Sequence, residues 1–239
     1  MQELRFRTLG PVPEIVPGDD LPARIAALAP PGPGVIVVAQ KIVSKAEGRV
    51  VSLADVTPSP RAHEVARAVD KDPRVVELVL NESRRIVRQA PGVLICETHH
   101  GLICANAGLD QSNAPGADHV VLLPVDPDGS ARRICDRLGP GYGVVVSDTF
   151  GRPWRQGLVD VAIGVAGLTP VLDCTDRVDR AGRPLRVTFM ALADQLAAAA
   201  GLLMGKDAGT PVIWCDGLTP IGDGRLADLL RDPARDLFR

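Results

Sequence analysis

The chain contains 239 residues, of which 46% are hydrophobic and 23% are charged, a composition that supports a packed core and excludes a disordered or fibrous protein. Lysine and arginine number 27 against 29 aspartate and glutamate residues, so the broad basic surface of a duplex-binding protein is not expected. No apolar run approaches the roughly 18 to 20 residues of a membrane-spanning helix, and the beginning of the chain lacks the apolar region of a signal peptide. We therefore expect a cytoplasmic protein that binds neither nucleic acid nor membranes.

Apolar runs bounded by Gly, Pro, Asn or Asp predict the strands. They cover residues 34–39, 92–96, 119–124, 143–147 and 211–215. Apolar residues at helical intervals predict the helices. They cover residues 60–69, 73–87, 130–138 and 188–204. The third helix is expected to be capped by Asp128 or Ser130, and the fourth to end at Gly205.

The spacing of the strands favours an α+β fold with mixed, largely antiparallel sheets and packed helices over a doubly wound sheet. Residues 93–96 and 101–105 are close enough to form a hairpin. No low-complexity linker divides the chain, and we expect one domain over residues 1–239. The cysteines are predicted to be buried thiols because they are widely spaced in apolar surroundings and form no CxxC pair. They are Cys96, Cys104, Cys135, Cys174 and Cys215.

The first candidate binding residues are basic and follow the strand predicted over residues 34–39. Lys41, Lys45 and Arg49 recur every four residues and would form a phosphate clamp on one side of a helix, or simply a solvated face. No GxGxxG follows that strand and no GxxxxGK[ST] occurs, so a bound nucleotide would be held in another way.

Residues 104–113, CANAGLDQSN, form a second polar segment. Asp110 and Asn113 offer oxygen ligands or hydrogen-bonding groups three residues apart, and an Asx turn is the alternative interpretation.

The third segment, residues 144–157, is the most informative. Asp148 and Thr149 follow an apolar strand, and Arg152 and Arg155 come soon after, within what is expected to be one loop. Carboxylate and hydroxyl oxygens suit Mg²⁺ or Mn²⁺, while guanidinium groups suit phosphate; a capped turn with a surface ion pair is the alternative.

A fourth segment, residues 204–212, places Lys206 and Asp207 between glycines, where either a phosphate-facing loop or ordinary helix-end chemistry explains the pattern. His99 and His100 flank the predicted hairpin, and either could act as a general base. The surrounding sequence shows no pattern of a Ser or Cys nucleophile paired with them. Turn histidines are the better interpretation.

Four long stretches of the chain read, in order, VIVVAQKIVSKAEGRVVSL, HGLICANAGLDQSN, VVVSDTFGRPWRQGLVDVAIGVAG and LLMGK. Together they strongly resemble the coenzyme F420-0:L-glutamate ligase family, within a similarity that extends over about residues 10–217. The resemblance implies a GTP-dependent ligase that joins L-glutamate to F420-0 and then extends the tail through γ-linkages. It further implies an α+β fold assembled as an intertwined homodimer, a pair of divalent cations, Mg²⁺ or Mn²⁺, on the triphosphate, and K⁺ as an associated ion.

The resemblance also assigns roles to residues of this chain. Asp110 and Asp148 resemble the ligands of one cation, and Thr149 a ligand of the second. The residues that resemble the family's nucleotide contacts are Val12, Pro13, Glu14, Ile15, Ser44, Lys45, Asn113, Met204, Gly205, Lys206, Asp207, Ala208, Gly209, Thr210 and Pro211. Arg49, the last basic residue of the AQKIVSKAEGR segment, is expected to join them in binding the nucleotide. Lys206 departs from the pattern: some relatives have an oxygen-bearing ligand there, and an ammonium group cannot coordinate a metal.

Amide formation from a carboxylate and an amine requires activation, most simply as an acyl phosphate made from the γ-phosphate of GTP. In this hypothesis Asp110 and Asp148 hold the cation, and Arg152 or Arg155 orients an anionic substrate. Alternatives are a related metal- and nucleotide-dependent ligase or phosphotransferase acting on another carboxylate, and a nucleotide-sensing subunit without turnover. Some relatives carry a C-terminal flavin-binding reductase domain, which is not expected within 239 residues.

Overall fold

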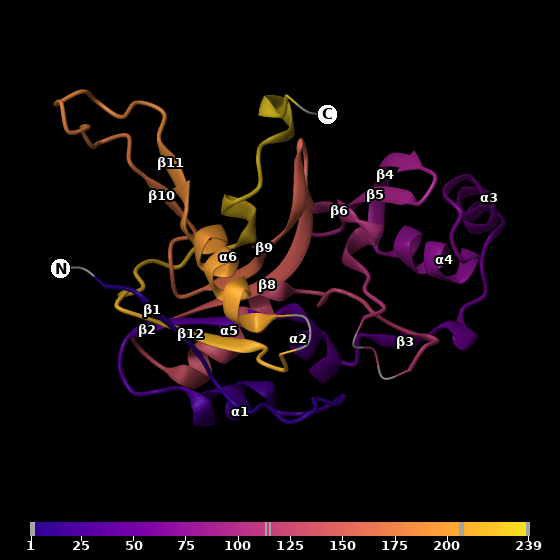
Figure 1. Ribbon diagram of the computed structural model, residues 1–239, viewed down its shortest axis with the longest axis horizontal. Coiled ribbons are helices and arrows are strands. Elements are labelled where there is room, and N and C mark those ends of the chain that lie inside the picture. Colours follow the sequence, from indigo (N-terminus) through magenta and orange to yellow (C-terminus); the bar gives the residue numbers. More distant parts are fainter. Residues whose placement is uncertain (1–2, 113, 115, 206–207, 238–239) are drawn as a thin grey trace.

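The computed structural model describes residues 3–112, 114, 116–205 and 208–237. Its centre is a five-stranded sheet with the order β1-β12-β2-β8-β9 (Figure 1). The pair β2 and β8 is parallel, and every other neighbouring pair in this sheet is antiparallel. The strands are β1 (Arg5–Thr8), β2 (Gly34–Ala39), β8 (Tyr142–Arg152), β9 (Arg155–Ala166) and β12 (Val212–Asp216).

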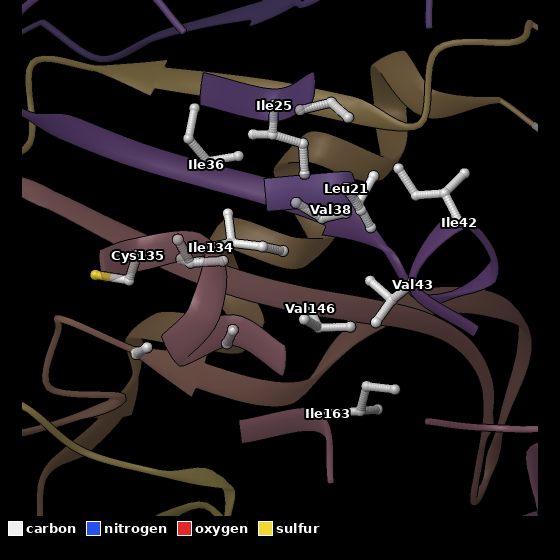
Figure 2. Close-up of a cluster of buried hydrophobic side chains, with 14 of the residues drawn as sticks. Leu21, Ile25, Ile36, Val38, Ile42, Val43, Ile134, Cys135, Val146 and Ile163 are labelled. Atoms are coloured by element: carbon white, nitrogen blue, oxygen red, sulfur yellow. The ribbon is translucent and has the colours of Figure 1, made fainter. Parts of the chain in front are cut away.

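Helices cover both faces of this sheet because its strands are apolar on both sides. On one face lie α1 (Leu21–Leu28) and α5 (Pro127–Leu138), whose Ile25 and Ile134 share a buried cluster with Ile36 and Val146 of the sheet (Figure 2). On the other face lies α6 (Leu192–Met204), whose small and aliphatic residues form a second cluster with sheet residues such as Val145.

A smaller lobe follows β2 in the chain and lies to one side of the sheet in Figure 1. It contains a three-stranded antiparallel sheet with the order β4-β5-β6 and its own apolar core. Its elements are α3 (Pro60–Val69), α4 (Pro73–Asn81), β4 (Ser83–Ala90), β5 (Val93–Thr98) and β6 (Ile103–Ala105). The antiparallel pair β3 (Val50–Ser52) and β7 (His119–Val121) lies where the chain enters and leaves the lobe.

Two further features complete the fold. The short helix α2 (Gln40–Ala46) follows β2 without an intervening loop. An arm formed by β10 (Val171–Asp173) and β11 (Phe189–Ala191) extends from the body of the molecule (Figure 1). Single 3₁₀ turns cover Leu53–Asp55, Asn106–Gly108, Leu226–Asp228 and Pro233–Arg235.

The predicted α+β class with mixed, largely antiparallel sheets is confirmed, as are the hairpin of β5 with β6 and the burial of all five free cysteines. None of the helices in the described ranges combines the length and apolarity required to cross a membrane.

Several predicted boundaries are wrong. The helix expected over 73–87 ends at Asn81, because residues from Ser83 onward pair with β5 instead, as in the register of Ile86 with Cys96. Here strand pairing outweighs a helical apolar pattern. The helix expected from Ser130 begins at Pro127, since Asp126 rather than Asp128 or Ser130 caps it by accepting from the Gly129 N–H.

The loop expected after Ser147 is also wrong. The strand β8 continues to Arg152, and β9 returns from Arg155, so Asp148 and Thr149 lie within a strand. The helix expected from Thr188 begins only at Leu192, because residues 189–191 pair with β10. In both places the missing information is a long-range strand partner.

Candidate active site

The ends of several sheet strands meet at one edge of the molecule. The parallel pair β2 and β8 aligns Ala39, the last residue of β2, with Ser147, so α2 begins beside Asp148 while β8 continues to Arg152. Ligand sites of sheets with parallel strands lie at this edge. The antiparallel strand β12 begins here, since Val212 pairs with Val38, and the chain after β1 passes here as well, with the Leu9 N–H bonded to the Val212 carbonyl.

These segments enclose a cavity of about 600 Å³. Its walls carry both apolar and polar groups, and its titratable residues come from different segments of the chain except Lys41 and Lys45, which both belong to α2. The lining residues are Val12, Pro13, Glu14, Ile15, Ala39, Gln40, Lys41, Ile42, Lys45, Asp110, Ser147, Asp148, Thr149, Leu158, Val159, Asp160, Ala198, Gly201, Leu202, Met204, Gly205, Gly209, Thr210 and Pro211.

Asp110 is held in the cavity wall by two neighbours. The Lys41 ammonium lies 2.8 Å from Asp110 Oδ2 and also donates to Ser112 Oγ at 2.6 Å. The Ser112 N–H donates to Asp110 Oδ1 at 2.7 Å, which is the Asx turn considered from the sequence. Burial raises the pKa of the Asp110 carboxyl, but the hydrogen bonds from Lys41 and Ser112 outweigh it, so its pKa lies below the ordinary value.

Asp148 has the opposite electrostatic environment. Burial, with the nearby charges of Asp110 and Asp160, raises the pKa of Asp148 to about 7, although a hydrogen bond from the Thr149 backbone and the charge of Lys41 act against the shift. A carboxylate in this state gains from a nearby cation, because the cation offsets both the lost hydration and the like charge of Asp110.

Thr149 lies on the other face of β8, toward α6. Its hydroxyl donates to Asp160 Oδ1 at 2.6 Å, and Thr149 and Asp160 are direct partners in the register of β8 with β9. Gly201 of α6 lies against the same carboxylate: a Cβ built on Gly201 would be 2.3 Å from Asp160 Oδ2. Carboxylate and hydroxyl oxygens therefore line both faces of the end of β8.

Many of the residues singled out in the sequence lie together in this cavity. Those that line it are Val12, Pro13, Glu14, Ile15, Lys41, Lys45, Asp110, Asp148, Thr149, Met204, Gly205, Gly209, Thr210 and Pro211. Lys45 lies 2.5 Å from Glu14, and Thr210 donates to the carbonyl of Leu203 at 2.8 Å, which ties the loop after α6 to the end of that helix.

Other singled-out residues do not line the cavity. Ser44 is buried and donates to Gln40 Oε1 at 2.8 Å, while Ala208 is exposed. Arg49 lies beyond the end of α2, where it pairs with Glu82 at 2.7 Å and donates to the Leu123 carbonyl, so it does not share one face with Lys41 and Lys45. Asn113, Lys206 and Asp207 lie outside the described residues.

Arg152 and Arg155 also lie away from the cavity. They pair with each other across the tip of the hairpin formed by β8 and β9, where Arg155 is exposed and Arg152 donates to the Gln156 carbonyl at 2.8 Å. Within one chain, neither guanidinium group faces the cavity. The histidines are turn residues, as interpreted from the sequence: His99 bonds to the Asn81 carbonyl and His100 to the Pro124 carbonyl, each at 2.9 Å.

Sequence reasoning missed two residues that shape the cavity, Asp160 and Gly201. Lys41 was singled out in the basic segment, yet nothing in the sequence indicated that its partner would be Asp110. Asp160 and Gly201 carried no local signal, because their relation to Thr149 depends on the pairing of β8 with β9 and on the packing of α6.

The cavity does not contain a preformed metal cage. Among the described residues, no group of three or more His, Cys, Asp or Glu side chains is arranged to hold a metal ion. A divalent cation here would be bound by a few protein oxygens and completed by oxygens of a ligand and water, which is the usual manner for Mg²⁺ on phosphates.

Comparison with known proteins places this geometry in a family. The family model described as F420-0:Gamma-glutamyl ligase matches residues 10–217. A protein of Methanopyrus kandleri named coenzyme F420:L-glutamate ligase is 45% identical over 243 residues, covering 96% of each chain. Proteins with the same name are 46% identical in Methanothermobacter thermautotrophicus, covering 86% of this chain and 84% of the relative, and 47% identical in Halobacterium salinarum, covering 84% and 82%.

The matched region contains the cavity residues of all the contributing segments, and the resemblance recognised from the four sequence stretches is confirmed. The chain belongs to the F420-0:gamma-glutamyl ligase family of enzymes.

Proposed function

We propose that this enzyme joins L-glutamate to coenzyme F420-0 in a GTP-dependent reaction and extends the tail through γ-linked glutamates. The observation that carries the proposal is the convergence of Asp110, Asp148 and Thr149, from separate faces, on one cavity of about 600 Å³ that also receives Lys41 and Lys45. Carboxylate and hydroxyl oxygens beside ammonium groups suit a triphosphate with its cations. The family membership supplies the substrates.

The residues present fit a divalent cation, Mg²⁺ or Mn²⁺. Asp148 is a carboxylate destabilised by burial and by Asp110, so its environment favours a positive charge. Asp110 and Asp148 would hold one cation, and Thr149 would contribute to a second. When bound, these ions neutralise phosphate charge and polarise the transferring phosphoryl group. A K⁺ requirement belongs to the same proposal and is tested by replacing K⁺ with Na⁺.

The proposed reaction has two steps. A carboxylate oxygen of F420-0 attacks the γ-phosphorus of GTP, forming an acyl phosphate as the bond to the β,γ-bridging oxygen breaks and GDP leaves. The amine of L-glutamate then attacks the acyl carbon, forming the amide as inorganic phosphate leaves and the amine loses its protons. Lys45 and Lys41 supply positive charge beside the phosphates, and buried apolar lining residues such as Ile15 restrict water, which would hydrolyse the acyl phosphate.

We propose a homodimer as the working form. The hairpin of β8 and β9 exposes large apolar side chains, with Trp154 86% and Leu158 61% exposed, and the arm of β10 and β11 exposes Phe189 at 60%. Apolar groups of this size on projecting segments are typical of surfaces that another subunit covers. In such a dimer, the Arg152 and Arg155 hairpin tip of one subunit would be available to orient an anionic substrate at the partner.

Mass spectrometry of the product after incubation with F420-0, GTP, Mn²⁺ and L-glutamate tests the function directly. The expected result is F420-0 extended by one or more glutamate residues, with GDP and phosphate formed in equal amounts to the amide bonds. Phosphate release that requires a different carboxylate would favour the related ligase, and tight GTP binding without phosphate release under any combination would favour a nucleotide sensor.

A further inference from the structure

Thr149 and Asp160 form a short hydrogen bond on the side of the cavity that faces α6. They face each other across the β8 and β9 pair, and the threonine hydroxyl donates to Asp160 Oδ1 at 2.6 Å. Directly opposed residues of an antiparallel pair point to the same face of the sheet, so both side chains face the cavity that they line.

This hydrogen bond determines how the hydroxyl can act. A threonine hydroxyl has one proton to donate and two lone pairs to offer. Since Asp160 accepts the proton, the lone pairs of Thr149 Oγ1 are directed away from the carboxylate and are available to a cation. Without an acceptor in this position, the hydroxyl would rotate and could present its proton instead. Metal ligands are commonly oriented by such outer partners.

The helix α6 is shaped to admit the Asp160 carboxylate. Gly201 lies within this helix, where glycine is unfavourable relative to alanine, and an added Cβ would lie 2.3 Å from Asp160 Oδ2 and 2.9 Å from Asp160 Cγ. Any larger residue at position 201 would push the carboxylate away from its place behind Thr149. The absence of a side chain therefore has a packing reason, which is the aspartate.

We propose that Asp160 is a positioning residue that fixes the Thr149 hydroxyl as an acceptor for the second cation, and that Gly201 provides the space it requires. This inference rests on the proposed function, in which Thr149 is a cation ligand. It assigns no direct metal contact to Asp160. The hydrogen-bond partner of Asp160 is Thr149, the proposed ligand of the second cation, and neither of the two proposed ligands of the first.

The test is a titration with Mn²⁺ followed by electron paramagnetic resonance, with the protein at saturating guanosine 5′-(β,γ-imido)triphosphate, which requires no turnover. Asp160→Ala and Thr149→Val are each expected to weaken one of the two Mn²⁺ sites, the one assigned to the second cation, about 10- to 100-fold and to affect the other site far less. Asp160→Asn keeps a carbonyl oxygen as acceptor, so its affinity is expected to fall between those of the wild type and Asp160→Ala. Gly201→Ala is expected to resemble Asp160→Ala.

A double-mutant cycle separates positioning from direct action. If Asp160 acts through Thr149, the combined Thr149→Val and Asp160→Ala variant binds Mn²⁺ no more weakly than either single variant. Additive losses, unchanged binding in Asp160→Ala, or a single Mn²⁺ site in the wild type would each overturn the proposal. Asp194→Asn is the matched control, because Asp194 also joins α6 to β9, by accepting from the Ala162 N–H at 2.9 Å, but lies outside the cavity lining. Absence of the glutamylated product in the wild type would defeat the proposed function alone, since the titration is independent of it.

Discussion

The Lys41 ammonium and the Asp110 carboxylate form an ion pair of 2.8 Å inside the cavity, joining α2 to the segment that follows β6. The pair ties the end of the central sheet to the return from the smaller lobe, so the two parts of the fold are connected at the site itself. Because Lys41 also bonds to Ser112, the ammonium is held by two groups and is well placed to contact an anionic ligand.

Replacing Lys41 by Gln removes this point charge while keeping much of the side-chain volume. We expect the KM for GTP to rise about tenfold or more, since hydrogen bonds to charged groups contribute about 1.5 to 3 kcal/mol. Steady-state kinetics with GTP as the varied substrate measures the effect. Arg67→Gln, at an exposed position in the last turn of α3, is the control, and an equal rise in that variant would argue against a local role for Lys41.

Asp148→Asn is expected to reduce product formation by about 100-fold or more, because a neutral amide replaces a carboxylate that the proposed cation requires. The fold should be retained, since the two side chains have nearly the same shape. Product is measured by mass spectrometry and folding by circular dichroism. Asp136→Asn on the exposed face of α5 serves as control, and near-normal turnover in Asp148→Asn would defeat the assignment of this residue.

Asp194 gives a prediction for pH. Burial raises the pKa of Asp194 above its ordinary 3.8, although its hydrogen bond from Ala162 acts in the other direction. The folded protein therefore holds this proton more tightly than the unfolded chain, and stability is lost as the pH rises from about 4 through the raised pKa. In Asp194→Asn the loss is absent, so the Tm of the variant relative to the wild type should increase between pH 4 and pH 7.

Asp173 is expected to change stability with pH in the opposite direction to Asp194. A hydrogen bond from the Thr175 backbone lowers the pKa of this exposed carboxyl, so its contribution to stability is present above the ordinary pKa and is lost as the pH falls. The Tm of Asp173→Asn relative to the wild type should therefore decrease slightly as the pH rises from about 2 to about 5. Parallel pH trends in the two variants would contradict the assigned directions.

Ile134→Ala tests the packing of α5 against the sheet. The side chain is 1% exposed and belongs to the cluster in Figure 2. Truncation should cost about 2 to 5 kcal/mol and lower the Tm by about 5 to 15 °C in a chain of this size. Thermal unfolding gives the value. Val125→Ala, at a residue that is 70% exposed, should change stability by no more than about 0.5 kcal/mol.

Local patterns in the sequence predicted the parts of the fold that depend on neighbours in the chain. The buried strand β2 was predicted with its full extent because it is a continuous apolar run, and α3 because its apolar spacing is bounded by a cap and a Pro. Residues 83–87 show the limit of such reasoning: their spacing also suits a helix, and only the partner strand β5 makes them a strand.

The candidate site was predictable to a similar degree. Asp110, Asp148 and Thr149 stand out as polar residues beside apolar runs, and the family resemblance gave them roles. The relation of Thr149 to Asp160 and Gly201 was hidden, because it arises from a cross-strand pair and a helix packed over it. Arg152 and Arg155 were expected beside the cavity because the segment was interpreted as a loop; as a strand, it carries them away to the hairpin tip.

The strand β8 also determines which side of the sheet each of its functional side chains faces. Alternate residues of a strand face opposite sides, and accordingly Asp148 lies toward Asp110 while its neighbour Thr149 lies toward α6. Inserting or deleting a single residue between the buried Val146 and this pair would turn Asp148 toward α6 and Thr149 toward Asp110. The length of this short segment is therefore constrained as strictly as its amino-acid identities.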